Sequence, residues 1–541
     1  MNEPILPKQL WVPVMTRRLS KPRVLWTGPD AAAAGFDPEQ VYCCQMPYEP
    51  DDLYIDQTRV EWADRYGGVG AGKGGGSGRC SSFDGLQTKG VGRTALAPPE
   101  GDENHSSGTL VLLEAAAEAV FSRIYQIALP FGAVPVHAII WTGGRFIRGR
   151  SGGMQDIRMR TLAVRPFVAR PAHFMRNPDF MPGREPAGAE FRGLSADAAR
   201  VKIALGALAR NLSHAMGLQN DPSRDLTHAL NAGLLEWTRR VAWQCAAAFA
   251  KRLPHGTLSC SNVALSGAYL DFGLSNFLPT YQRVCWAGNQ DLWTEAGNLV
   301  RTAELLVKQI SKYMPLNNSA GLVEPHTISN EFGVHFGARL AIEMSKMAGL
   351  TEDIATECPV RLRDTWFRSM RAILAFGSDE PVISNNPGRM SDGRGAPAPR
   401  RGGRYDLNAI LRETAWRFDP VAWDAELSAR NLQANLRRDF ISASMDVCLW
   451  LSQWSGASMA SVQGWLAQQA SRKNSVLQCL VREHDKHVAL PQFRQFEEGP
   501  EPWRIGAAIE ERLRKAAYVL GDFDRDMSGK SGAEQLRSFA Q

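Results

Sequence analysis

The chain has 541 residues, of which 44% are hydrophobic and 22% are charged, and this usage is typical of a globular protein with one large core or several domains. Its 62 basic and 56 acidic residues leave a net charge of +6, which is too weak over this length to indicate nucleic acid binding but fits an anionic small ligand. The nine cysteines form no CxxC pair and no zinc-ligand spacing, which argues against a disulfide framework and predicts a cytoplasmic protein. No stretch approaches the ~20 apolar residues of a membrane span, so we expect no membrane partner.

The first elements that the sequence predicts form a small group of strands around one helix. Residues 62–102 are rich in glycine and poor in hydrophobic periodicity, with one possible strand at 86–89. Residues 109–128 place apolar side chains at helical spacing, and short buried strands are predicted at 134–141 and 161–168. Together these elements predict a small mixed lobe.

Long helical patterns follow at 196–214, 226–251 and 293–313 and predict a mostly helical second lobe. Between the last two of these helices, residues 255–278 consist of short apolar runs broken by glycines. A segment of this kind is suited to a chemical site carried on a loop.

The predicted fold class is α+β, with a two-lobed core and a mostly helical C-terminal extension. A Pro/Gly/Arg-rich stretch predicts a flexible linker or loop ahead of that extension. The predicted parts are an N-terminal segment (1–60), a small nucleotide-binding lobe (61–192), a helical lobe with a metal site (193–383), the linker or loop (384–404) and the helical extension (405–541).

A glycine cluster, GGVGAGKGGGSGR, runs from Gly67 to Arg79. Repeated glycine lets backbone amides approach a phosphate without an intervening Cβ. The cluster almost satisfies a Walker A loop, but Gly74 stands where a Ser or Thr would bind magnesium, and no hydrophobic strand precedes it. A Walker A site is therefore not predicted, and a loop without ligand remains the alternative.

Lys89 ends the possible strand at 86–89, and Glu114 follows on the next predicted helix. In a kinase-like lobe, a strand lysine contacts phosphate and a helix glutamate fixes it, because an ammonium group needs a carboxylate partner to stay beside an anion. Glu118 is an alternative partner on the same helix. A solvated surface pair is the other interpretation.

The segment HGTLSCSNVALSGAYLDFG, from His255 to Gly273, separates Asn262 and Asp271 by a short apolar, hairpin-like stretch. An Asn amide oxygen and an Asp carboxylate are suitable ligands for Mg²⁺, and kinase-type sites pair them in this way to neutralise a triphosphate. Residues 271–273 also read as a DFG tripeptide.

These motifs together resemble the selenoprotein O family. GGGSGR resembles that family's LGDGR, LQTKGVGRT its LQLKGAGRT, and HGTLSCSNVALSGAYLDFG its HGVLNTDNMSILGLTIDYG. Asn289 and Gln290 with the following GNLVRTAE resemble its NQP and WNLLRLAE, and all matches keep their order over residues 65–315. The resemblance implies a protein-kinase-like fold that binds ATP in a flipped orientation and transfers AMP to protein hydroxyls.

The resemblance also implies roles for individual residues. ARPAHFMRN is similar to the family's phosphate-binding APSFIRFG, which makes Arg176 a phosphate ligand and Arg170, displaced by one position, a second one; ordinary surface arginines are the alternative. Carried over in the same way, the nucleotide contacts are Gly76, Gly78 and Arg79; the catalytic groups are Lys89 on the phosphates, Glu114 orienting it, and Asp271; and the metal ligands are Asn262 and Asp271.

Three departures from the family pattern concern the chemistry. Ser261 replaces the Asp often assigned as proton acceptor, Ser77 replaces the Asp of LGDGR, and the C-terminal selenocysteine or cysteine before two serines is absent. Much phosphoryl-type catalysis is positioning and electrostatics, so adenylyl transfer remains the expectation.

We therefore expect an ATP-dependent adenylyltransferase that uses Mg²⁺ or Mn²⁺ and modifies a Ser, Thr or Tyr hydroxyl of a protein or peptide. One alternative is a nucleotide-binding pseudokinase scaffold. Another is a different ATP-dependent modification, such as phosphorylation or glutamylation of a specialised peptide or metabolite, because a fold does not fix its chemistry.

Overall fold

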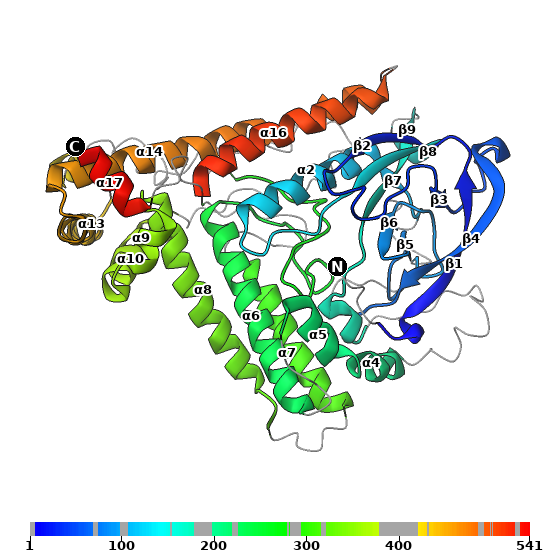
Figure 1. Ribbon diagram of the computed structural model, residues 1–541, viewed down its shortest axis with the longest axis horizontal. Coiled ribbons are helices and arrows are strands. Elements are labelled where there is room, and N and C mark those ends of the chain that lie inside the picture. Colours follow the sequence, from blue (N-terminus) through cyan, green and yellow to red (C-terminus); the bar gives the residue numbers. More distant parts are fainter. Residues whose placement is uncertain are drawn as a thin grey trace.

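The protein combines one antiparallel sheet with a larger set of helices (Figure 1). The computed structural model describes residues 6–68, 74–97, 107–151, 154–177, 197–218, 225–278, 281, 294–314, 321–377, 420–429, 432–484, 492–497, 499, 501–524 and 531–540. The predicted linker at 384–404 lies outside these ranges, as do Asn289 and Gln290. The mixed α and β composition predicted from the sequence is confirmed.

The sheet has nine strands in the order β2-β8-β9-β6-β5-β4-β1-β3, with β7 paired to β9. All pairs between these strands are antiparallel, and every strand in the described ranges lies within the first 166 residues. The strands are β1 (Trp11–Leu19), β2 (Arg23–Thr27), β3 (Tyr42–Cys43), β4 (Tyr54–Asp64), β5 (Cys80–Phe83), β6 (Leu86–Lys89), β7 (Leu110–Val111), β8 (Ala138–Ser151) and β9 (Met154–Pro166).

Residues 6–60, which are most of the predicted N-terminal segment, contribute strands to this sheet. They supply β1, β2, β3 and most of β4, and the boundary predicted at residue 60 falls inside β4. β1 alternates buried Val12 and Val14 with exposed Met15, which turns one face of the strand to the core. Met15 pairs with Val60, and such long-range pairing gives no local signal beyond this alternation.

The elements around the predicted site agree closely with the sequence. β6 covers the predicted strand, and α2 (Leu112–Ala128) covers most of the predicted helix. Alanines 115, 116 and 119 are fully buried, so α2 lies close to its neighbours. β8 and β9 are longer than expected because the charged residues between them alternate with apolar ones along a paired ribbon, as at Ile147 and Ile157.

Helices make up most of the rest of the described chain. The predicted helix at 196–214 is two helices, broken beside Gly206, whereas α6 and α7 match their predictions. The helices are α4 (Asp197–Leu205), α5 (Leu208–Met216), α6 (Leu226–Ala250), α7 (Ala296–Tyr313), α8 (Pro325–Met347), α9 (Glu352–Glu357), α10 (Val360–Gly377), α12 (Pro420–Ala429), α13 (Ala434–Ser455), α14 (Met459–His484), α16 (Ile505–Asp524) and α17 (Gly532–Ala540), with short 3₁₀ helices η1 (Lys8–Leu10), η2 (Asp51–Leu53), η3 (Pro171–Phe174) and η6 (Pro502–Arg504).

The C-terminal helices return to the sheet. α14 and α16 run along one side of the molecule, and α16 packs against both α2 and β2 (Figure 1). Trp26 Nε1 donates a hydrogen bond to Glu510 Oε1 at 2.5 Å, and Arg158 Nη1 donates one to Glu497 Oε2 at 3.0 Å. Within the described ranges, no helix is both long enough and apolar enough to cross a bilayer.

Candidate functional site

The loop between α6 and α7 forms a short hairpin that brings Asn262 and Asp271 together. Val263 pairs with Tyr269 across the hairpin, and Leu270 N donates a hydrogen bond to Asn262 O at 3.1 Å. Gly267 makes the turn with φ of 93°, a left-handed conformation that favours glycine. The hairpin predicted from the sequence is thus present, with the two candidate metal ligands at its open end.

Buried hydrogen bonds hold this loop in place. Glu295, the residue before α7, accepts a hydrogen bond from the backbone N of His255 at 2.8 Å. His255 Nε2 lies 2.8 Å from Leu270 O, and the Tyr125 hydroxyl of α2 donates to Pro254 O at 2.9 Å. The loop is therefore tied to a helix on each side and to its own second strand.

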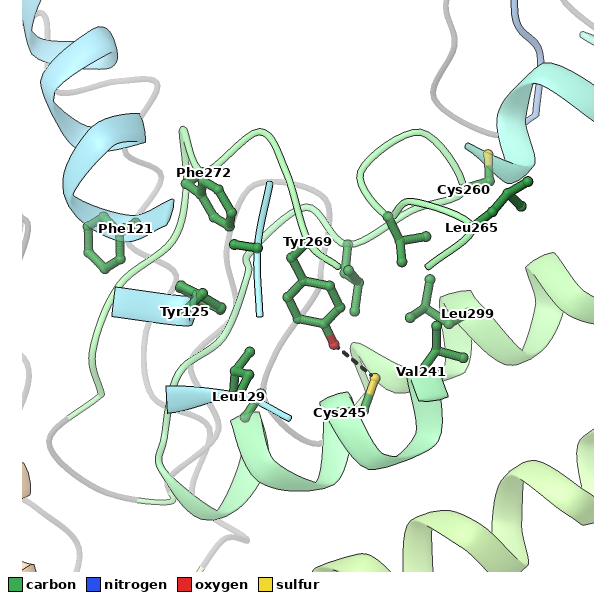
Figure 2. Packing of buried hydrophobic residues seen from close by; sticks show 14 of the residues in the cluster. Phe121, Tyr125, Leu129, Val241, Cys245, Cys260, Leu265, Tyr269, Phe272 and Leu299 are labelled. Atoms are coloured by element: carbon green, nitrogen blue, oxygen red, sulfur yellow. Dashed lines mark hydrogen bonds between the residues drawn. The ribbon is translucent and has the colours of Figure 1, made fainter. Parts of the chain in front are cut away.

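An aromatic layer lies beneath the hairpin (Figure 2). The ring of Phe272 lies 5.1 Å from that of Tyr125, and the Tyr269 hydroxyl and Cys245 Sγ are 3.2 Å apart. Phe272 is buried, whereas the side chain of Asp271 keeps 24% of its surface exposed. The packing fixes the backbone on which Asp271 stands and leaves its carboxylate accessible.

Lys89, Glu118 and Asp271 meet at one point. Lys89 Nζ is hydrogen-bonded to Glu118 Oε1 and lies 2.5 Å from Asp271 Oδ1. The three residues come from β6, α2 and the hairpin loop, and Lys89 and Glu118 are buried. Burial alone would lower the pKa of the Lys89 ammonium, but Asp271 and Glu118 raise it above its ordinary value.

The predicted pairing of Lys89 with Glu114 is wrong, and the alternative partner, Glu118, takes its place. Glu114 lies in the first turn of α2, where its Oε2 accepts a hydrogen bond from Arg79 Nη1 at 3.1 Å. Glu118 is one turn further along and points inward. Arg79 is thereby brought close to the site through Glu114, and its contact with nucleotide stays a prediction.

Arg165 on β9 belongs to the same cluster and was missed by the sequence analysis. Its Nη1 lies 3.3 Å from Asp271 Oδ1 and 3.7 Å from Glu118 Oε2, and its Nε and Nη2 donate to Gln87 Oε1 at 3.1 and 2.9 Å. Burial would raise the pKa of the Asp271 carboxyl, but the charges of Arg165 and Lys89 hold it well below its usual value. An arginine that directly follows the apolar run 162–164 inside a predicted strand was the available signal.

Gly76 and Gly78 are needed for close packing. A Cβ on Gly76 would lie 2.5 Å from Asp64 O and 2.6 Å from Leu96 Cδ1, and a Cβ on Gly78 would lie 2.9 Å from Ala97 Cα. These distances are shorter than atoms can approach, so any side chain here would displace the backbone. This packing accounts for the two glycines, and their predicted contact with nucleotide stays a prediction.

Asp64, at the end of β4, is the centre of a second buried cluster that the sequence did not reveal. Its carboxylate accepts hydrogen bonds from Ser77 Oγ at 2.6 Å, Gln87 Nε2 at 3.1 Å and Arg170 Nη2, and it lies 2.8 Å from His173 Nε2. Burial would raise the pKa of this carboxyl, but Arg170 and His173 with Ser77 keep it well below its usual value. Gln87 links this cluster to Arg165.

The two predicted phosphate-binding arginines differ in their surroundings. Arg170 is buried, and besides Asp64 it contacts the hairpin loop through a hydrogen bond from Nη1 to Ser261 O at 3.2 Å. Arg176 is exposed, and its backbone O accepts a hydrogen bond from Gly68 N at 2.9 Å. Arg176 therefore stands beside the glycine cluster, whereas Arg170 joins Asp64 to the hairpin.

Asn262 and Asp271 are the residues that would hold a magnesium or manganese ion at the open end of the hairpin. Asn262 Nδ2 donates to Thr257 O at 2.8 Å, so the amide oxygen is turned the other way, where it accepts from Ser261 Oγ at 3.3 Å. Both cations on Asp271 contact Oδ1. In the part of the chain that the structure describes, no three His, Cys, Asp or Glu residues group around a possible metal position. Mg²⁺ needs only one or two protein oxygens when phosphates and waters complete its shell.

The sequence matches no family model, and no curated protein matches it. The resemblance to selenoprotein O therefore rests on the short motifs quoted above. In the structure, Lys89 contacts both Glu118 and Asp271, although the three residues lie far apart along the chain.

Proposed function

We propose that this chain is a kinase-like enzyme of the selenoprotein O type that binds ATP with Mg²⁺ or Mn²⁺ and transfers AMP to a hydroxyl group of a protein or peptide. The observation that carries the proposal is the contact of Lys89 with both Glu118 and Asp271. A phosphate-binding lysine, its helix carboxylate and a metal-binding aspartate are the parts that kinase-type sites assemble. The cytoplasm, which supplies ATP and Mg²⁺, is the compartment that we propose.

The order of elements supports a two-lobed, kinase-like core. A glycine-rich segment joins β4 to β5, Lys89 follows on β6, and Glu118 follows on α2. The Asn262–Asp271 hairpin comes later, among the helices. Kinases place these parts in the same order along the chain. Lys89 stands on a central strand, because β6 lies between β9 and β5, and β1, β2 and β3 lie at or next to the edges of the sheet.

Each site residue has a role in the proposed reaction. Lys89 binds the phosphates and Glu118 holds its ammonium group in place, while Asn262 and Asp271 would hold the metal. When bound, the ion would neutralise charge on the triphosphate. The acceptor oxygen attacks the α-phosphorus, the bond from that phosphorus to the bridging oxygen of the β-phosphate breaks, and pyrophosphate leaves. Ser261 offers no carboxylate, so the hydroxyl proton passes to water.

Transfer of label from ATP tests this proposal. Purified protein is incubated with Mg²⁺ or Mn²⁺ and with ATP labelled separately at the α and γ phosphates, together with a candidate acceptor mixture. We expect label from the α position on protein, and none with Lys89→Ala or Asp271→Asn. Asp271 has φ of 66°, a conformation that Asn adopts more readily than Ala, so Asp271→Asn removes the charge with less backbone strain. Label transferred from the γ position would show that the reaction is phosphorylation and not adenylylation. Unchanged transfer by both variants would refute the proposed site.

A nucleotide-binding scaffold is the second candidate, and the environment of Ser261 favours it. The Ser261 hydroxyl lies 3.0 Å from Ser259 Oγ and donates to Asn262 Oδ1 at 3.3 Å, so hydroxyls and an amide stand where a proton-accepting carboxylate would be needed. Metal-dependent ATP binding without transfer to any acceptor would support the scaffold. Introducing the missing acid as Ser261→Asp should then create α-label transfer if its absence alone silences the site.

A further inference from the structure

The guanidinium of Arg165 is held along both of its edges. On one side, Nε and Nη2 donate to Gln87 Oε1 at 3.1 and 2.9 Å; on the other, Nη1 lies 3.3 Å from Asp271 Oδ1. Glu118 Oε2 is 3.7 Å from the same Nη1. Arg165 and Gln87 are also direct partners in the pairing of β9 with β6, so backbone and side chains fix the guanidinium together.

Gln87 is itself immobilised. Its Nε2 donates to Asp64 Oδ1 at 3.1 Å, and Asp64 is fully buried. Because the amide oxygen of Gln87 accepts two hydrogen bonds from Arg165, the guanidinium cannot rotate without breaking both. A planar guanidinium with fixed donors is suited to this kind of clamp.

Lys89 is held differently. Its ammonium group is shared between Glu118 and Asp271, and a lysine carries its charge on a flexible stem with rotatable donors. When a phosphate enters the proposed site, Lys89 can keep Glu118 and turn away from Asp271. Asp271 then loses one of the two cations that contact its Oδ1.

We propose that Arg165 is a positioning residue that keeps the Asp271 carboxylate oriented toward the nucleotide's metal ion when Lys89 turns to the phosphates. Both cations contact Oδ1, and no residue in the described ranges donates a hydrogen bond to Oδ2. Arg165 therefore retains one carboxylate oxygen and leaves the other for the ion. This inference rests on the proposed nucleotide function and adds to it a residue that acts on the metal through Asp271.

The measurement is the coupling between metal and ATP in the full chain. The dissociation constant of ATP is determined by calorimetry in EDTA and again in excess Mn²⁺, and the ratio of the two values gives the coupling. Arg165→Met removes both the positive charge and the planar set of hydrogen-bond donors, whereas Arg165→Lys keeps the charge only. Gln87→Met removes the clamp while leaving every charge of the cluster in place, so it serves if Arg165→Met does not fold.

Arg158→Met is the matched control. Arg158 lies on the same strand, is buried, and pairs with Glu497 at 3.0 Å, away from Asp271. This variant shows how much the coupling between metal and ATP changes when the loss of a buried arginine from β9 only lowers the stability of the protein. Thermal unfolding of every variant is recorded beside the titrations.

We expect the coupling to fall by about tenfold in Arg165→Met and Gln87→Met and by less in Arg165→Lys, with ATP affinity in EDTA within about twofold of wild type. Arg158→Met should lower the unfolding temperature and keep the wild-type coupling. Wild-type coupling in the folded Arg165 and Gln87 variants would overturn this inference alone. Absence of metal-dependent ATP binding in the wild-type protein would overturn the proposed function and this inference with it.

Discussion

Glu118 and Glu114 stand one helical turn apart on α2 and form a natural pair for comparison. Glu118 is buried against Lys89, whereas the side chain of Glu114 is 29% exposed beside Arg79. Breaking a buried ion pair by removing one charge costs about 3 kcal/mol or more, but a partly exposed pair contributes roughly 0.5 kcal/mol. The two carboxylates should therefore respond very differently to the same substitution.

We predict that Glu118→Gln lowers the free energy of unfolding by about 3 kcal/mol and that Glu114→Gln lowers it by roughly 0.5 kcal/mol. Urea unfolding of both variants measures the difference. ATP titration of the same samples should show weaker binding only for Glu118→Gln, because Lys89 then has a single carboxylate partner. Equal effects of the two substitutions would contradict the assignment of Glu118 as the partner of Lys89.

His173 gives the protein a defined response to acid. The backbone N of Arg170 donates to His173 Nδ1 at 3.0 Å, so the ring proton is on Nε2, which donates to Asp64. Burial and the charges of Arg170 and Arg200 lower the pKa of His173 to about 4, although Asp64 opposes them. The folded ring is thus neutral down to a lower pH than the unfolded one.

Between pH 6.5 and about 4, the unfolded chain binds a proton at His173 that the folded protein does not. The contribution of His173 to the free energy of unfolding is complete above pH 6.5 and is lost as the pH falls toward 4. The total loss is roughly 3 kcal/mol. We predict that His173→Gln flattens this part of the profile of unfolding free energy against pH. His326→Gln, at an exposed position of α8, is the control and should keep the wild-type slope.

At the scale of elements, α16 and η6 form a close contact with β2. A Cβ on Gly506 would lie 2.2 Å from Leu25 O, a backbone atom that cannot yield without moving the strand. Trp26, next along the strand, donates its indole hydrogen bond to Glu510 of α16. The close packing of α16 against the sheet therefore depends on glycine at position 506.

We predict that Gly506→Ala loosens this contact and lowers stability by about 1–3 kcal/mol. Hydrogen exchange should increase in β2, α16 and the α2 helix that α16 covers. Gly333→Ala in α8 is the matched control, because its Cβ would meet nothing within 4 Å, and it should be neutral or stabilising by up to about 1 kcal/mol. Unchanged exchange in β2 with Gly506→Ala would contradict the close contact.

At this scale, the sequence predicted elements that carry their signal locally. The periodicity of α2 and α6 and the glycine turn at Gly267 were sufficient to place those elements. β1 and β4 were missed because their sequences do not alternate cleanly between apolar and polar residues, and residues 55–60 of β4 are exposed or half-buried. Their pairing also joins segments some forty residues apart. The same limit applies to Arg165, whose partner Asp271 is 106 positions away.

At the scale of the whole molecule, α2 contacts the sheet, the hairpin loop and the C-terminal helix α16. It lies against β8 and β9, its Tyr125 holds the hairpin loop, and α16 covers it from the C-terminal region. The proposed lysine–glutamate pair is thus carried by an element that three regions position together. The sequence predicted the residues of this centre because their motifs are short and local. It did not predict the contacts that support them, because those contacts join residues far apart along the chain.

The packing of α16 against α2 and the sheet has a consequence for biosynthesis. Ile505, Ile509, Leu513 and Leu520 share one core with α2, although about 340 residues separate the end of β9 from the start of α16. At synthesis rates of roughly 5–20 residues per second, that interval lasts on the order of tens of seconds. Throughout it, the sheet and α2 have left the ribosome while the apolar surface that α16 covers is still open to solvent. The nascent chain therefore completes its first-made core with some of its last-made residues.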